Sequence, residues 1–395
     1  MAENTITSLF PSLFAGLDIV SRELTGFIPA AQRDARTDRA AKGQTVTYHV
    51  APAGNSAAIT PAMVVPDPTG QTIAPQTMTI SDSKAAEFGF VGEDILALEN
   101  NGAGFSEVQA DMFAQALRVL VNEVETDLAV AALAGACRAY GTPQTEPFAT
   151  NTAGLAQMGK ILKDNGAPLS NLQCVLDTTA GANLQTLFNL NDNRDIANTP
   201  MNQQGILINS HGFAVRETGQ GQSHTAGTGA SATTDNAGYS VGDVTITLAS
   251  AGTGTILVDD VISFAGDPNQ YKVLTGDADV SGGGTVVLRS PGLMQAIAAS
   301  TTAITVATDG ASSPTKNWEA RGVAFDRNAL HLIARAPALP PGGDMASDRF
   351  MIVDPRSGLP FEVAVYKGYH KVRYEVGLSW GVEAVAGRHI AALIA

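Results

Sequence analysis

The chain has 395 residues, with 38 acidic side chains against 24 basic ones and a formal net charge of −14. This length is enough for two or three domains with a substantial core. The acidic balance argues against a surface built to neutralise nucleic acid, because such a surface needs an excess of lysine and arginine, so any contact with nucleic acid must be local. The N-terminus shows no basic segment followed by an apolar core, and the longest apolar runs are too short to cross a bilayer. We therefore expect a protein that is neither secreted by that route nor embedded in a membrane.

The N-terminal segment contains a predicted helix followed by a basic stretch. Residues 11–24 place leucine and valine side chains on one helical face and predict a short amphipathic helix. Four cations then recur at every third position, and these are Arg33, Arg36, Arg39 and Lys42. The pattern fits a solvated helix face with internal ion pairs as well as it fits an arm that docks on an acidic neighbour or faces a polyanion.

Residues 45–90 predict a long β-hairpin. Two runs in which apolar and polar residues alternate, one beginning at Val46 and the other at Met78, flank a segment interrupted by five prolines. A two-stranded hairpin alone is marginally stable in water, because nothing covers its apolar face. We therefore expect the hairpin to lie on another part of the chain or on another subunit.

Residues 106–134 predict one long amphipathic helix, about 40 Å in length at about 1.5 Å per residue. Ser106 is a suitable N-cap, apolar residues recur every three or four positions, and Gly135 ends the pattern. Glu125 is assigned to the solvated side of this helix. The helix is interpreted either as a core helix of a mixed domain or as a spine against which distant segments pack.

After the helix, residues 151–217 alternate between helical and strand patterns, whereas residues 218–316 are glycine-rich, hold no helical period and predict an inserted all-β module. The expected strands of this module are residues 244–248, 255–258, 261–264, 271–274, 285–289 and 303–307. Its opening, residues 219–238, is expected to be a mobile loop. Residues 317–395 return to mixed structure, with a hairpin around the turn at 354–358 and a half-buried strand at 372–380.

No pattern in the chain predicts catalysis. The six histidines have no metal-ligand spacing, and neither a nucleophile elbow nor a phosphate-binding loop is present. The carboxylate pairs Asp259/Asp260 and Glu123/Glu125 are interpreted as a turn and a solvated helix face. Cys137 and Cys174 are interpreted as small buried hydrophobic side chains that form no disulfide. We expect a protein that is not an enzyme and that has no metal and no cofactor.

The order of these elements resembles that of the major capsid proteins of tailed bacteriophages, which have the Hong Kong 97-like fold. In particular it is similar to the coat-protein family of the Salmonella short-tailed phages, whose members carry a telokin-like β insertion. Two stretches carry this resemblance, GVAFDRNALHLIARAPAL at residues 322–339 and DDVISFAGDPNQYKV at residues 259–273. One departure is Asp326, where the family pattern has histidine.

The resemblance implies an α+β capsid subunit in six parts. These are an N-terminal arm (1–44), an extended hairpin loop (45–92), a peripheral domain (93–150) with a spine helix (106–134), an axial αβ domain (151–217), an inserted all-β domain (218–316) and a return to the axial and peripheral domains (317–395). From its compact, strand-rich composition we expect the insertion either to stabilise contacts between capsomers across a two-fold axis or to help the subunit to fold.

The implied function is that of a major capsid protein. Its hexamers and pentamers form an icosahedral shell that encloses double-stranded DNA without binding it specifically. A scaffolding protein and a portal are implied partners, and the implied location is the virion, assembled in the bacterial cytoplasm. The four basic residues, Arg33, Arg36, Arg39 and Lys42, become candidate inter-subunit or inner-surface cations. The alternative is a phage tail or surface adhesion protein with a β module, against which the long helix and the absence of repeats count.

Overall fold

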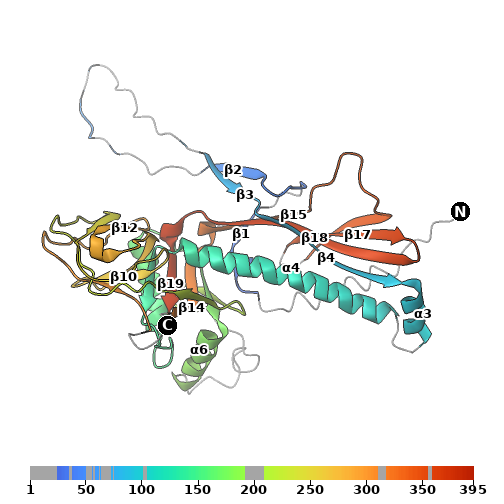
Figure 1. Cartoon of the computed structure of the whole chain (residues 1–395), viewed down its shortest axis with the longest axis horizontal. Helices are drawn as coiled ribbons and strands as arrows, with labels where there is room; N and C mark the ends of the chain where they lie inside the picture. The colour runs from blue at the N-terminus through green and yellow to red at the C-terminus, as the bar shows by residue number, and fades with distance from the viewer. Residues whose placement is uncertain are drawn as a thin grey trace.

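The computed structural model describes residues 25–34, 38–49, 56, 58–61, 63, 73, 75–100, 105–191, 209–309, 317–354 and 358–395. Over these residues the chain is elongated, with one long helix running along much of its length (Figure 1). The helix predicted over residues 11–24 lies outside the described residues. The α+β class is confirmed, and so are the long helix, the extended hairpin and the strand-rich segment that the resemblance implies.

The long helix is α4 (Phe105–Gly135), which begins one residue before the predicted start. Its buried face follows the predicted stripe through Ala116, Leu120, Val124 and Leu128. Two of the predictions for individual residues on this helix are wrong. Met112 is exposed, although the sequence placed it on the apolar stripe, and Glu125 is buried rather than solvated.

One face of α4 packs on a six-stranded sheet of the described residues. Along the sheet run β1 (Gln32–Arg33), β15 (Leu330–Arg335), β18 (Lys371–Ala384), β17 (Pro360–Gly368) and β16 (Asp348–Val353), and β4 (Asp82–Val91) pairs with β18. The hairpin predicted around 354–358 and the strand predicted at 372–380 are thus confirmed. Phe88 of β4 stacks on Tyr374 of β18, and both rings contact Phe113 of α4, so aromatic packing joins the helix to the sheet.

The predicted hairpin is made of β2 (Thr45–His49) and β3 (Pro75–Thr79), which pair antiparallel from Thr45↔Thr79 to His49↔Pro75. Its second run does not continue to residue 90 in the hairpin, because the chain leaves it after Ile80 and enters the large sheet as β4. Met78 and Ile80 are buried with Ala40 and Ile333. The base of the hairpin therefore packs on its own chain.

A second sheet of the described residues has eleven strands and continues from the αβ region into the strand-rich segment. Its main path is β13 (Ile304–Val306), β10 (Val261–Phe264), β11 (Gln270–Thr275), β5 (Arg138–Gly141), β19 (Ile390–Ile394), β14 (Asn317–Asp326), β6 (Leu172–Asp177) and β7 (Ala214–Thr218). Off this path, β8 (Gln222–Thr225) pairs with β14, β12 (Gly284–Leu288) with β11, and β9 (Thr245–Leu248) with β12.

The remaining helices are short. They are α2 (Phe27–Ala30), α3 (Gly92–Asn100), α5 (Ala153–Asp164) and α6 (Thr178–Asn191), with 3-10 turns η2 (Val280–Gly282), η3 (Arg327–Ala329) and η4 (Gly387–His389). None of the helices in the described part of the chain is long and apolar enough to cross a bilayer. α5 and α6 both lie in residues 151–217, where the sequence predicts alternating helical and strand patterns.

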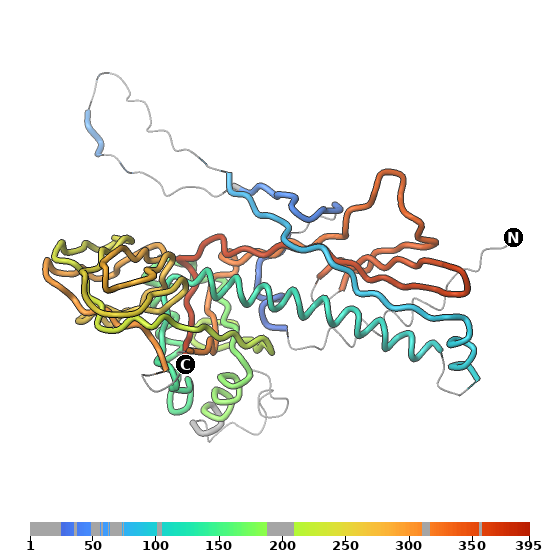
Figure 2. The backbone as a smooth tube through the Cα atoms, viewed as in Figure 1, coloured from blue at the N-terminus to red at the C-terminus, as the bar shows by residue number. Residues whose placement is uncertain are grey.

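The strand-rich segment lies at one end of the molecule (Figure 2) and matches most of the strands expected from the sequence. Residues 255–258 are an exception, because only Ile256 forms an isolated bridge there, with Asp277. The expectation of a mobile loop at 219–238 is also wrong, since β8 lies within it and pairs with β14. This glycine-rich stretch forms a strand because it pairs with the edge of β14. Local composition does not predict that pairing.

Cys137 and Cys174 are free and buried, as expected. The interpretation of Asp259 and Asp260 as a turn is confirmed, since the amide of Asp260 donates to the carbonyl oxygen of Leu257 (3.3 Å), and within this turn Asp260 is 0% exposed. Its carboxylate accepts hydrogen bonds from the amides of Gly227 (3.1 Å) and Leu257 (2.7 Å), which compensate the cost of burying its charge.

Candidate assembly interface

The N-terminal segment is held on the long helix by a single buried carboxylate. Glu125 accepts hydrogen bonds from the backbone amides of Gly26 (2.6 Å), Phe27 (2.7 Å) and Ile28 (2.9 Å), and from the Thr218 hydroxyl (2.9 Å). The three amides are the unpaired donors at the start of α2, so the carboxylate caps that turn from a distant part of the chain. Burial raises the pKa of Glu125, while these hydrogen bonds act in the opposite direction.

Close packing fixes this segment further. A Cβ at Gly26 would lie 2.6 Å from a methyl group of Val175 and 2.7 Å from the carbonyl oxygen of Glu217, so the chain passes closer to the second sheet than other residues allow. Phe27 stacks on Phe325 of β14, with ring centres 6.2 Å apart. The direction in which the N-terminal segment leaves the body is therefore fixed by contacts to both α4 and the second sheet.

A second set of contacts joins residues 38–44 to the six-stranded sheet. We call the hydrogen bonds of Glu125 and those of Glu362 the two clasps. Arg39 donates two hydrogen bonds to the buried carboxylate of Glu362 (2.6 and 2.8 Å) and one to the carbonyl oxygen of Pro337 (2.8 Å). Arg349 contacts the same carboxylate (2.5 Å). Because this segment leads directly into β2, the clasp sets the position from which the hairpin starts.

The four candidate cations have different environments. Arg33 is half-buried at the end of β1, and Arg36 lies outside the described residues. Arg39 forms the intrachain pair with Glu362. Lys42 lies 3.6 Å from Asp82, and its side chain is 67% exposed. Of the described members of the set, Lys42 is thus the one that offers its charge to solvent.

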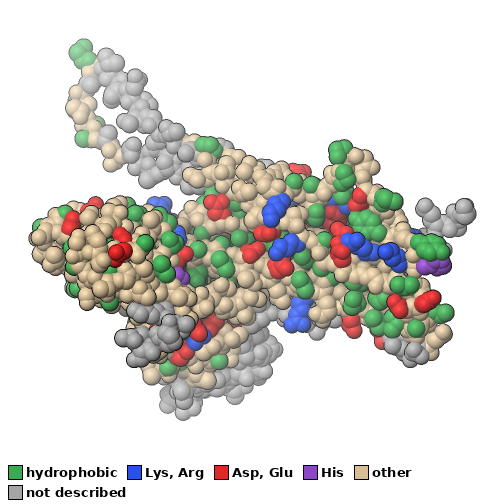
Figure 3. Space-filling model, in the orientation of Figure 1, with side chains coloured by type: hydrophobic (Ala, Val, Ile, Leu, Met, Phe, Trp, Pro, Cys, Tyr) green, Lys and Arg blue, Asp and Glu red, His purple; other side chains and the backbone are tan. Residues whose placement is uncertain are grey.

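Large apolar side chains are exposed at the ends of the projecting segments. Ile59 (99% exposed) and Met63 belong to the segment between β2 and β3, whose described residues lie well away from the rest of the chain (Figure 2). Met345 (93% exposed) lies between β15 and β16, and Tyr369 (90% exposed) lies at the turn between β17 and β18. Figure 3 shows hydrophobic side chains at these extremities, whereas basic and acidic side chains are interspersed along the body. Apolar groups at such positions are typical of surfaces that another molecule covers.

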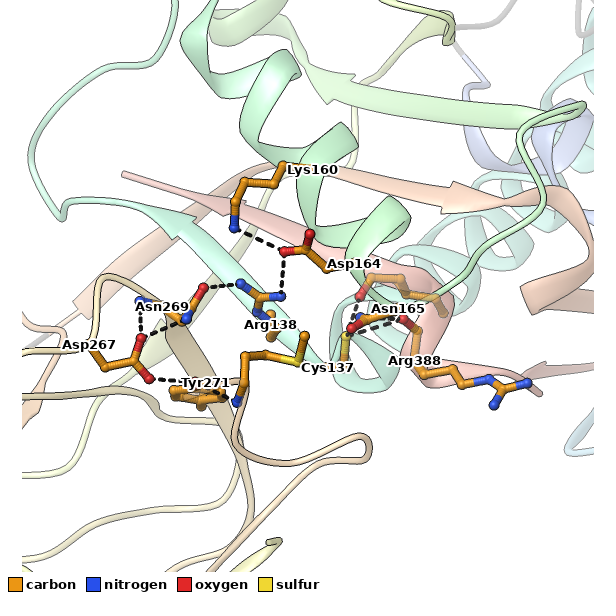
Figure 4. A network of polar contacts seen from close by, with 11 residues as sticks. Cys137, Arg138, Lys160, Asp164, Asn165, Asp267, Asn269, Tyr271 and Arg388 are labelled. Carbon is orange, nitrogen blue, oxygen red and sulfur yellow. Dashed lines mark hydrogen bonds and ion pairs between the residues drawn. The ribbon is translucent and has the colours of Figure 1, made fainter. Parts of the chain in front are cut away.

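A polar network ties the strand-rich segment to the rest of the molecule (Figure 4). The buried Arg138 of β5 lies 3.4 Å from Asp164 of α5, and it donates a hydrogen bond to Asn269, which precedes β11. Asn165 in turn donates to the carbonyl oxygen of Arg388 (2.7 Å). Since β11 also pairs directly with β5, this junction is both a continuous sheet and a set of side-chain contacts.

Lys272 of β11 is a fully buried cation at the same junction. Its ammonium donates to the carbonyl oxygen of Leu133 at the end of α4 (2.6 Å) and lies 3.1 Å from Asp259. Arg289 contacts the same Asp259 carboxylate (3.0 Å). Burial lowers the pKa of Lys272 to about 8, although Asp259 opposes the shift.

The lowered pKa of Lys272 predicts a pH dependence of stability. Above about pH 8 the folded chain loses a proton that the unfolded chain keeps until about pH 10.4, so this group makes the free energy of unfolding rise with pH in that window. We expect the difference in unfolding free energy between the wild type and Lys272→Met to be flat below pH 7. It should then rise by at most about 1.4 kcal/mol per pH unit between pH 8 and 10.

Chemical denaturation of both proteins at several pH values measures this difference. Lys163→Met, at an exposed lysine of α5, is the matched control and should give a constant difference. A constant difference for Lys272→Met as well would show that Lys272 remains charged throughout.

Comparisons with known proteins give structural similarities alone. No protein-family model and no curated protein matches the chain. Among solved structures, it is similar to one titled "Capsid structure of the Cyanophage P-SCSP1u", at 12% identity and a TM-score of 0.47, covering 94% of this chain and 88% of that one. It is also similar to one titled "Crystal structure of virus-like particle from Pyrococcus furiosus" (9% identity, TM-score 0.43, covering 97% and 98%) and to one titled "Mycobacterium phage Che8" (10%, 0.41, covering 90% and 88%).

The sequence identified only some of the residues that fix the candidate interface. Arg39 was selected by its basic spacing, but its partner Glu362 was not, because the two lie in segments far apart in sequence. Glu125 was assigned to solvent although it lies four residues after Val121 and three before Leu128, which is the spacing of the apolar stripe. The position of Glu125 on this face was the feature of the sequence that could have indicated its burial. The described residues contain no group of three or more histidine, cysteine, aspartate or glutamate side chains placed to hold a metal ion.

Proposed function

We propose that this chain is a major capsid protein with the Hong Kong 97-like fold, which self-assembles as hexamers and pentamers into an icosahedral shell around double-stranded phage DNA. The observation that carries the proposal is the hairpin. Its base is packed on the chain through Met78 and Ile80, while Ile59 and Met63 near its tip stay fully exposed. A rigidly anchored projection with an apolar tip suits a contact with a second subunit.

Two other features support the same proposal. The clasps at Glu125 and Glu362 fix both the N-terminal segment and the start of the hairpin on the body, so these extended segments have defined directions. The exposed apolar residues lie at several extremities, including Met345 and Tyr369, as expected for a subunit with neighbours on more than one side.

The finer assignments are also part of the proposal. The six-part domain division and the kinship with the Salmonella short-tailed phage coat proteins rest on the element order and on residues 259–273 and 322–339. Residues 218–316 would correspond to the telokin-like insertion, and their strand content supports this. Asp326, which departs from the family pattern, is buried in β14. A scaffolding protein and a portal would be partners, and assembly would take place in the bacterial cytoplasm.

The proposal is tested by the size and shape of the purified protein, using light scattering followed by electron microscopy of the large fraction. Closed shells, or rings of five or six subunits that close when a scaffold is added, are the expected result. A protein that remains a monomer or dimer under all conditions would contradict it and would favour the tail or adhesion alternative.

The basic segment provides a prediction within this proposal. Arg39 is occupied by Glu362, so we propose that Arg36 and Lys42 are the cations of residues 32–42 that meet an acidic neighbour. We expect Arg36→Glu/Lys42→Glu to lower the yield of sedimenting particles several-fold. Lys42 is an exposed residue whose substitution should change the unfolding free energy by less than about 0.5 kcal/mol.

Lys163→Glu/Arg388→Glu makes the same change of net charge at exposed positions elsewhere and should leave the particle yield unchanged. An equal loss in both double variants would mean that net charge matters rather than the position of the cations.

A further inference from the structure

Three arginines from distant parts of the sequence meet beside the N-terminal segment. Arg33 ends β1, which pairs with β15, and η3 with Arg327 directly precedes β15. The amide of Arg327 donates to the carbonyl oxygen of Asn171 (3.2 Å), next to the start of β6. Arg216 of β7 pairs with Val175 of β6. We call Arg33, Arg216 and Arg327 the arginine cluster.

The cluster has little compensating negative charge within the described residues, where Asp354 acts on Arg33 without forming an ion pair with it. Other half-buried or buried arginines of the described residues form ion pairs with carboxylates. They are Arg39, Arg138, Arg289, Arg321, Arg335 and Arg349. In the cluster, Nε of Arg216 donates a long hydrogen bond to the neutral side-chain oxygen of Gln173 (3.5 Å). None of the three forms an ion pair with a described residue.

The cations also repel one another. Burial and the charge of Arg327 lower the pKa of Arg33, which the carboxylate of Asp354 only partly offsets. Burial and the same Arg327 lower the pKa of Arg216. The guanidinium of Arg33 is packed against Gly358, where a Cβ would lie 2.1 Å from Nη1, so Arg33 has little room to turn away. A chain with an excess of 14 negative charges thus holds, in one place, three cations that form no ion pair with a described residue.

We propose that Arg33, Arg216 and Arg327 form a binding site for the phosphates of a nucleic-acid backbone. Guanidinium groups bind phosphate oxygens in pairs and are weakly hydrated, which suits half-buried positions. A duplex offers about one negative charge per 1.7 Å of its axis, dense enough to neutralise three adjacent cations, whereas an isolated carboxylate pairs with one or two. Because the rest of the chain is acidic, this site would give a local and salt-sensitive contact that is independent of base sequence.

The inference rests on the proposed function in one respect, namely that the chain meets DNA. The test is therefore made on the unassembled subunit with a 30-base-pair duplex of mixed sequence, by fluorescence anisotropy between 20 and 200 mM salt. We expect the logarithm of the wild-type affinity to fall against the logarithm of salt with a slope of about −2.7, the value for three phosphate contacts. Arg216→Gln/Arg327→Gln should bind at least about tenfold more weakly at 50 mM salt, with a slope near −0.9.

The control is Lys163→Gln/Arg388→Gln, which removes the same charge at exposed positions and should bind like the wild type. The cluster variant should also unfold at no lower a denaturant concentration than the wild type, because the change relieves repulsion between like charges. No binding by the wild type, or equal losses in the two double variants, would overturn the proposal. A cluster variant that binds DNA normally but changes the self-association of the chain would assign the site to an acidic segment of a second copy and would overturn it as well. Shells that fail to form, with DNA binding intact, would count against the proposed function alone.

Discussion

Replacing Glu125 by alanine should lower the free energy of unfolding by about 3–5 kcal/mol, the largest effect that we expect from a single substitution in the described residues. The variant leaves three buried backbone amides and the Thr218 hydroxyl without their acceptor. A hydrogen bond to a charged group contributes about 1.5–3 kcal/mol, and each buried donor left unpaired adds a desolvation cost. Chemical denaturation of the purified subunit measures the effect.

Glu125→Gln separates the charge of this group from its size. The amide keeps one acceptor oxygen, but its NH2 group would face an amide donor of the N-terminal segment, so a loss of about 2 kcal/mol is expected. Glu123→Gln on the same helix, at a partly exposed residue paired with Lys84, is the matched control and should cost less than about 1 kcal/mol. Faster hydrogen exchange at residues 26–28 in the Glu125 variants, but not in the control, would locate the effect at the cap. Unchanged stability in both Glu125 variants would mean that the carboxylate does not hold this segment.

Much of the fold follows from periodicity in the sequence. The stripe from Ala116 to Leu128 predicted α4, and the alternation at residues 372–380 predicted β18, because in both cases a single buried face repeats with the period of the element. The strand predicted at 261–264 coincides with β10. These elements are predictable because local pattern and tertiary burial agree.

The contacts that fix the candidate interface are less predictable, because they join segments about 100 to 300 residues apart. Arg39 and Glu362, or Glu125 and Phe27, meet only when two sheets and a helix have packed, and no local pattern pairs them. The same reason explains β8, which becomes a strand by pairing with β14. It also explains Asp260, which is buried because backbone amides surround it. The burial of these polar groups was not predicted from the sequence, because their hydrogen-bond partners are brought to them only by the tertiary fold.

The hairpin tip should control assembly without affecting the stability of the subunit. Ile59 and Met63 are fully exposed, so Ile59→Ser/Met63→Ser should leave the unfolding free energy within about 0.5 kcal/mol of the wild type. If a neighbouring subunit covers them, each contributes about 1.5–3 kcal/mol to that contact. The loss of at least about 3 kcal/mol per subunit should raise the protein concentration needed for shells or rings about a hundredfold, since about 1.4 kcal/mol corresponds to a factor of ten.

Light scattering over a concentration series, with electron microscopy of the products, measures this threshold. Ile59→Leu/Met63→Leu keeps both side chains apolar and should assemble near the wild-type threshold, which separates apolar contact from residue identity. If the serine variant assembles at the wild-type concentration, the tip is not a contact between subunits. The hairpin would then not support the proposed function, although its base would still be packed on the chain through Met78 and Ile80.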